Sequence, residues 1–191
     1  RYPSDYEINS IGIRGIYLGN YVHWDPKAQH EEMIKIYQYK TSSFQRTFDC
    51  YDYTDCYNYM DIHDLLKFFK HGYSKVTDHA CREIRFGRIT RNQAIQLVNY
   101  HQFKGLKYKK LFAEWLNIPD DSLTFLLDQF RNKIYWEEIE IGKWKFKDSK
   151  IEDDTNQNQK MILNEKAKFL ENNNLDMEKK SKYIIFGKGY P

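Results

Sequence analysis

The sequence from Lys70 to Leu97 reads KHGYSKVTDHACREIRFGRITRNQAIQL. Two glycines, Gly72 and Gly87, divide this stretch into three parts. Glycine commonly follows the last residue of a helix, because it adopts a left-handed backbone without steric penalty. The stretch therefore predicts the end of one helix and two further helices that meet at a glycine break.

Hydroxyl side chains mark where these two helices should begin. Thr77 is a suitable N-cap and predicts a short helix through Ile84. Thr90 and Gln93 have the spacing of a capping box, in which each side chain bonds the backbone N–H of the other residue. We therefore expect a pair of helices over residues 77–84 and 90–98.

Apolar residues recur at helical spacing in much of the remaining chain, which predicts a mainly α fold. Asp25-Pro26 should begin one helix, because aspartate caps and proline fits the first helical turn. Further helices are expected over residues 62–69, 108–116, 123–130 and 161–172. Small β additions are expected as a strand over 11–21, a hairpin over 139–146 and a strand over 183–186, with a mobile loop at 149–159.

The bulk composition excludes several classes of protein. A chain of 191 residues with 41% hydrophobic and 17% aromatic residues can bury a core. The net charge of +3 is too small to indicate binding to nucleic acid or a membrane surface. No apolar run reaches the roughly 20 residues of a membrane helix, so no membrane insertion is expected. Three cysteines, an odd and low count, fit a reducing cytoplasm.

A candidate site lies inside the opening stretch, in six residues: Asp78, His79, Glu83, Arg85, Arg88 and Arg91. Helix N-termini offer free N–H groups to anions, and arginine makes forked contacts with phosphate. We expect Asp78, Glu83 and the arginines to bind a substrate or nucleotide phosphate, and His79 to move a proton in catalysis. Alternatively, these residues form ion pairs that only hold two helices at a fixed angle.

A metal site is not expected. Cys50, Cys56 and His63 lie within fourteen residues, but they lack the tight ligand spacing of a zinc site and no second pair completes a tetrahedron. Free cysteines and core or solvated histidines are the simpler interpretation.

The chain from Ile11 to Trp136 resembles the C-terminal half of the N-acetyl sugar amidotransferases, which are ATP pyrophosphatases of the PP-loop type. The similarity is strongest from His63 to Val98 and includes Asn20-Tyr21 and Trp24-Asp25. It implies an enzyme that adenylates the acetamido oxygen of a sugar and displaces AMP with ammonia to give an acetamidino group. The substrate would be a nucleotide-linked N-acetyl sugar, and the product would serve lipopolysaccharide (O-antigen) or flagellar glycan synthesis in the cytoplasm.

The resemblance also implies partners, because such enzymes receive ammonia from a glutaminase and a channel subunit. ATP with Mg would bind mainly to an N-terminal PP-loop domain, and no Ser-Gly-Gly-x-Asp-Ser-like loop occurs in these 191 residues. We therefore expect no cofactor to bind this chain alone, which should be inactive by itself.

The expected organisation has three parts. Residues 1–25 would be the last strand and linker of the PP-loop domain, 26–136 a helical domain, and 137–191 an appendage with the hairpin, loop, terminal helix and strand. Two other functions compete with part of an amidotransferase. One is a non-catalytic module that docks the glutaminase and channel partners. The other is an RNA-handling domain, which the modest charge disfavours.

Overall fold

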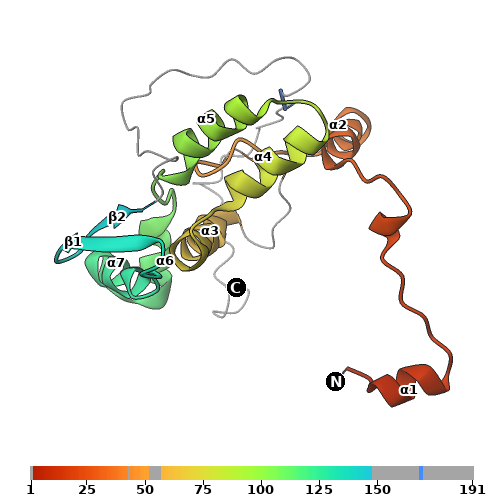
Figure 1. Ribbon diagram of the computed structural model, residues 1–191, viewed down its shortest axis with the longest axis horizontal. Coiled ribbons are helices and arrows are strands. Elements are labelled where there is room, and N and C mark those ends of the chain that lie inside the picture. Colours follow the sequence, from red (N-terminus) through yellow and green to blue (C-terminus); the bar gives the residue numbers. More distant parts are fainter. Residues whose placement is uncertain (1, 43, 52–56, 148–167, 170–191) are drawn as a thin grey trace.

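The computed structural model describes residues 2–42, 44–51, 57–147 and 168–169 (Figure 1). Its elements are the helices α1 (Asp5–Ser10), α2 (Pro26–Tyr37), α3 (Tyr57–His71), α4 (Lys75–Arg85), α5 (Arg91–Gln102), α6 (Lys109–Leu116) and α7 (Asp120–Asp128), the 3-10 turn η1 (Leu18–Asn20), and the strands β1 (Trp136–Glu140) and β2 (Lys143–Phe146). The expectation of a mainly α fold with a small β addition is confirmed.

The strands form one antiparallel hairpin, in which Trp136 lies opposite Phe146 and Glu138 lies opposite Trp144. Gly142 turns the chain with a φ of 73°, as expected from its place between the two strands. The side chains that face the body are Trp136, Trp144 and Phe146. Ile139, within the expected hairpin, is exposed.

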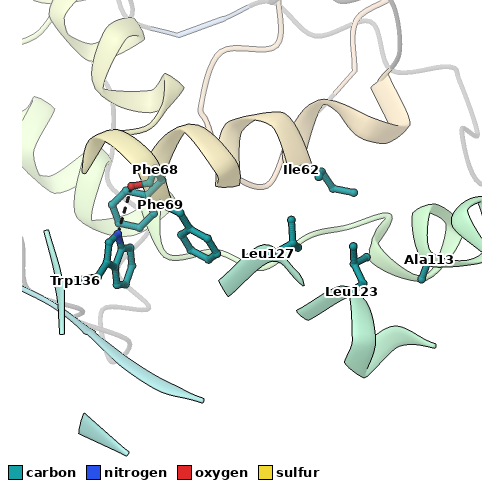
Figure 2. Close-up of a cluster of buried hydrophobic side chains, with 7 residues drawn as sticks. All are labelled: Ile62, Phe68, Phe69, Ala113, Leu123, Leu127 and Trp136. Atoms are coloured by element: carbon teal, nitrogen blue, oxygen red, sulfur yellow. Dashed lines mark hydrogen bonds between the residues drawn. The ribbon is translucent and has the colours of Figure 1, made fainter. Parts of the chain in front are cut away.

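The largest apolar cluster, which we call the α3 cluster, joins α3 to α6, α7 and the hairpin (Figure 2). Its buried members are Ile62, Phe68, Phe69, Ala113, Leu123, Leu127 and Trp136. The indole N–H of Trp136 donates a hydrogen bond to the backbone carbonyl of Phe68, so the one polar atom of this ring has a partner. Long-range packing therefore fixes the hairpin to a helix that lies almost seventy residues earlier in the chain.

A second cluster, which we call the α4–α5 seam, lies between those two helices. Its buried members are Val76, Ala80, Ile89, Ala94, Leu97 and Val98, with Phe48 and Ile84 packed against them. Thr90 caps α5 with the predicted capping box: its hydroxyl accepts from Gln93 N–H at 3.3 Å, and the Gln93 side chain accepts from Thr90 N–H at 2.8 Å.

The predicted start of the first helix of this pair is wrong, because Thr77 lies inside α4. The helix begins at Lys75, and Ser74, its N-cap residue, makes no side-chain capping bond. The backbone N–H of Lys75 donates instead to Asp64 Oδ1 at 2.6 Å. Since Asp64 belongs to α3, a tertiary contact replaces the local cap, and no local pattern could have shown it.

Residues 2–24, which we call the arm, leave the body beyond α2 (Figure 1). The expected strand over 11–21 is not formed: residues 13–17 run without regular structure and η1 follows them. Ser4 and Glu7 form a capping box that begins α1 in a segment expected to be loose. A strand needs a neighbouring strand for its hydrogen bonds, and the arm has none among the described residues.

Most of the expected C-terminal elements lie outside the described residues: the loop over 149–159, the strand over 183–186 and nearly all of the helix over 161–172. Of that helix only Lys168 and Phe169 are described, and neither is helical. None of the helices among the described residues combines the length and the apolar character that crossing a bilayer requires.

Candidate functional site

Three of the predicted site residues are held in a buried network of charges around α4. Glu83 is at its centre and is completely inaccessible to solvent. Its carboxylate accepts from Arg82 Nε at 2.9 Å and from an Arg88 guanidinium nitrogen at 3.0 Å. Two forked cations on one buried carboxylate satisfy its charge and most of its hydrogen-bonding capacity, which makes burial tolerable.

Arg88 joins this centre to Asp25, the residue that follows the arm. One guanidinium nitrogen binds Glu83, and the other forms an ion pair with Asp25 Oδ2. Asp25 also caps α2, as the sequence predicted, by accepting from Lys27 N–H at 3.1 Å and Ala28 N–H at 3.3 Å. The Arg88 guanidinium lies 4.5 Å from the Phe86 ring centroid, a favourable cation–π position. The α4–α5 corner is thereby tied to the start of α2.

On the other side of Glu83, the network continues through Arg82 to Asp49 and His79. A guanidinium nitrogen of Arg82 donates to Asp49 Oδ2 at 2.5 Å. Burial alone would lower the pKa of Arg82, but the charge of Asp49 and hydrogen bonds to Asp49 and Glu83 outweigh it and raise that pKa. His79 Nε2 lies 3.9 Å from the same Asp49 oxygen, and His79 Nδ1 lies 2.7 Å from Thr47 Oγ1.

The other three predicted site residues lie at the surface. Asp78 is exposed and pairs with Lys67 of α3. Arg85, in the last turn of α4, and Arg91, at the first position of α5, are exposed and make no ion pair with a carboxylate of the described residues. The structure therefore separates the six residues into a set held in the network, namely the buried His79 and Glu83 with the partly buried Arg88, and an exposed set, Asp78, Arg85 and Arg91.

A second buried ion pair lies beside the network and was not found from the sequence. Arg46 Nε donates to Asp64 Oδ2 at 2.7 Å, and both side chains are almost completely buried. Arg46 also donates to the Lys104 carbonyl at 2.5 Å, while Asp64 caps α4. The signal for these residues was weak, because Arg46, Thr47 and Asp49 lie in an irregular segment with no repeating pattern.

Asp61 lies near this pair on α3 and is also buried. Its Oδ2 accepts from Lys107 N–H at 3.5 Å, and its Oδ1 has no hydrogen-bond partner among the described residues. Burial raises the pKa of the Asp61 carboxyl, and the Lys107 N–H bond and the Arg46 charge oppose that rise only in part.

The described residues contain no group of three or more His, Cys, Asp and Glu side chains with the proximity needed to hold a metal ion. Cys50 is buried and Cys81 is exposed. Cys56 lies outside the described residues.

The fold and the network define a small helical domain whose α4–α5 corner is fixed by buried ion pairs. A family model described as "LPS biosynthesis protein WbpG-like, C-terminal domain" matches residues 38–150, which is more than half of the chain. The chain belongs to this family of lipopolysaccharide biosynthesis proteins. No curated protein matches the chain. The whole network lies within the matched residues except for Asp25, which lies before them.

Proposed function

We propose that this chain is the C-terminal part of an ATP-dependent amidotransferase that converts a sugar acetamido group to an acetamidino group with ammonia. The family places it in lipopolysaccharide synthesis, and the resemblance to N-acetyl sugar amidotransferases supplies the reaction. In this proposal, ATP and Mg bind to a PP-loop domain elsewhere in the protein. The present chain contributes contacts to a nucleotide-linked N-acetyl sugar.

The observation that carries this proposal is the division of the site arginines. Arg88 is held by Glu83 and Asp25, so its charge is already matched within the chain. Arg85 and Arg91 flank the same corner with exposed guanidinium groups. Two such groups on a corner held by buried ion pairs suit the diphosphate of a nucleotide sugar, because forked donors match phosphate oxygens.

This division assigns different roles to the predicted residues. Arg85 and Arg91 contact the diphosphate, while Glu83 and Arg88 position the corner that carries them. Asp78 is turned toward Lys67 and keeps that lysine charge away from the ligand. His79 is buried against Thr47, so any proton transfer by His79 requires the substrate or a water molecule to reach the Asp49 side of its ring.

Binding of UDP-N-acetylglucosamine, measured by calorimetry, tests the diphosphate contact. The Arg85→Ala/Arg91→Ala double variant should bind at least tenfold more weakly, a loss of about 1.4 kcal/mol. The matched control is Lys35→Ala/Lys110→Ala, which removes two exposed positive charges from α2 and α6. Equal binding by both double variants would show that net charge, rather than this corner, holds the ligand.

The proposed reaction has its own test. The isolated chain should release neither AMP nor pyrophosphate from ATP in the presence of UDP-N-acetylglucosamine and ammonia, because its sequence contains no Ser-Gly-Gly-x-Asp-Ser-like loop. The complete protein should release both. Release of AMP by the isolated chain would contradict the assignment of the ATP site to another domain.

A second candidate function is docking of the glutaminase and ammonia-channel partners. The observation that favours it is the exposed apolar side of α7, where Phe125, Leu126 and the following Phe130 each have about half or more of their surface in solvent. In the complete enzyme reconstituted with these partners, Phe125→Asp should impair product formation from glutamine and leave product formation from ammonia unchanged. Equal activity with both nitrogen sources would refute this surface as the docking site.

A further inference from the structure

Phe169 packs its ring into the smallest of the three apolar clusters among the described residues. The buried members of this cluster are Ile34 of α2, Cys50 and Tyr51. The ring centroid of Phe169 lies 4.9 Å from that of Tyr51 and 5.8 Å from that of Phe48. An aromatic side chain from much later in the chain therefore lies across the short segment that runs from Phe48 to Tyr51.

Helix α2 contacts the same ring through Lys27, which is buried. The ammonium group of Lys27 lies 5.8 Å from the ring centroid of Phe169, within the range of a cation–π interaction. The same ammonium group pairs with Glu31, one turn further along α2. The site thus offers an aromatic wall on one side and a cation on the other, and both favour a ring as the occupant.

The segment that Phe169 crosses carries Asp49, a member of the charge network around α4. The N–H of Tyr51 donates to Asp49 Oδ1 at 2.6 Å, so the position of Tyr51 is tied to this carboxylate. On the other side of Asp49, the ring of Phe48 meets that of His79 edge to face, with 6.4 Å between the centroids. Phe169 therefore contacts both residues that flank Asp49 and is separated from His79 by a single ring.

Phe169 is held less firmly than the residues that it contacts. Cys50 and Tyr51 are almost completely buried, whereas Phe169 is only partly buried. Lys168 and Phe169, the short blue piece in Figure 1, belong to neither helix nor strand, so no regular hydrogen-bond ladder fixes the ring. Regions with few apolar contacts and no such ladder open locally at a lower free energy than the whole protein needs to unfold.

We propose that Phe169 is a displaceable cover of the Asp49 side of His79. In the closed form, the rings of Phe169 and Phe48 keep solvent away from Nε2 of His79. When Phe169 leaves, Phe48 loses a neighbour and Nε2 becomes accessible to water or to a substrate, while Nδ1 stays bound to Thr47. This inference rests on the proposed function only for the use of His79 in proton transfer, since the opening itself needs no ligand.

Carbethoxylation by diethyl pyrocarbonate, located by mass spectrometry, measures access to His79 in the 191-residue chain without any ligand. His71 at the end of α3 is exposed and supplies a reference rate in the same sample. Phe169→Ala should accelerate the modification of His79 by at least about tenfold and leave that of His71 unchanged. Phe169→Tyr keeps the ring and should retain the parental rate.

The thiol of Cys50 is a second probe of the same opening, because Cys50 is buried in the cluster against which Phe169 packs. Its alkylation by iodoacetamide should also be at least about tenfold faster in Phe169→Ala, whereas alkylation of the exposed Cys81 should not change. Phe112→Ala removes a partly buried ring from the α3 cluster and is the matched control. It should leave His79 and Cys50 at their parental rates.

The urea dependence of the parental rate distinguishes a displaceable cover from a fixed part of the core. Local opening exposes little surface, so modification of His79 at low urea concentration should be nearly independent of that concentration. A rate that rises as steeply as global unfolding would overturn the proposal, since His79 would then open only with the whole domain. Equal rates for Phe169→Ala and the parent would also overturn it. No nucleotide or sugar is present, so these outcomes are separate from a failure of the amidotransferase assignment.

Discussion

The α3 cluster and the α4–α5 region bury their interiors with different chemistry. Around α3, rings and aliphatic side chains fill the space, and the guanidinium of Arg131 lies 3.6 Å from the Phe69 ring centroid and 4.2 Å from that of Trp136. Around α4, a chain of charges from Asp25 to Asp49 runs beside a narrow apolar seam. The α3 cluster is stabilised by the apolar surface that it removes from water, whereas the ion pairs around α4 give that region a defined geometry.

This difference explains where a ligand site can be built. Apolar packing accepts substitutions of similar volume, because its contacts have no direction. Buried ion pairs are directional, and removing one partner leaves the other without compensation. The corner from which Arg85 and Arg91 project is held by the directional kind, which fixes the backbone that carries the two side chains.

The largest expected effect is that of a substitution in the α3 cluster. Phe68 is almost fully buried and contacts the rings of Phe69, Phe103, Trp136 and Phe146. Phe68→Ala should therefore reduce the free energy of unfolding by about 3–5 kcal/mol, measured by urea denaturation. The exposed Phe125→Ala should change it by no more than about 0.5 kcal/mol. Similar losses for both variants would mean that the α3 cluster is not the core.

A somewhat smaller loss of unfolding free energy is expected for a substitution in the charge network around α4. Glu83→Gln keeps the volume of the side chain but removes the charge that compensates Arg82 and Arg88, and it should cost about 3 kcal/mol. UDP-N-acetylglucosamine binding should weaken in the same variant under conditions where it remains folded, because the corner loses its anchor. An unchanged unfolding midpoint would show that the network contributes nothing to the packing of α4 against α5.

Thr90 tests a local contribution in the same region. Thr90→Ala removes the hydroxyl that accepts from Gln93 N–H, and it should cost about 1 kcal/mol of unfolding free energy. Thr90→Ser keeps an acceptor and should recover most of that loss. Ligand binding should remain near the parental level in both variants, since the capping box is separate from the guanidinium groups of Arg85 and Arg91.

The smallest expected effect is the change of stability with pH that Asp61 causes. Asp61 lies at the boundary between the α3 cluster and the α4–α5 region. Because burial raises the pKa of Asp61 in the folded protein, the folded state holds this proton more tightly than the unfolded state does. Asp61 therefore lowers stability as pH rises from the ordinary carboxyl pKa of 3.8 through the raised folded value. Asp61→Asn should become progressively more stable relative to the parent over that interval.

Urea midpoints measured for both proteins from about pH 4, just above the ordinary carboxyl pKa, to neutrality would show this trend. Asp121→Asn, at an exposed position of α7, controls for the loss of one negative charge. A stability difference between Asp61→Asn and the parent that does not vary with pH would contradict the inferred burial effect.

Local patterns were sufficient for much of the fold. Asp25-Pro26, Thr90 with Gln93, Gly72 and Gly142 were each interpreted correctly, because capping and glycine turns depend on atoms only a few residues apart. The start of α4 was misplaced at Thr77 because its cap comes from Asp64 of another helix. Residues 11–21 were misinterpreted as a strand, because apolar residues interspersed with glycines do not show whether a neighbouring strand is present.

Prediction of the candidate site from the sequence was limited in the same way. The sequence identified the arginines between α4 and α5 as a group, but their spacing did not distinguish Arg88, which pairs with Glu83 and Asp25, from Arg85 and Arg91 at the surface. It also missed Asp49, whose partners His79 and Arg82 lie thirty or more residues later. Charge pairing over such separations depends on the path of the whole chain.

The sequence by itself determined the helical class, the approximate positions of α2 to α7, the hairpin and the presence of an arginine-rich corner, since periodicity and capping act within a few residues. Only the tertiary structure decided which charges are buried, which carboxylate caps α4 and which surface of the arm stays exposed. These features arise when distant segments meet, and the cost of burying a charge is met only by a partner that folding brings within hydrogen-bond distance.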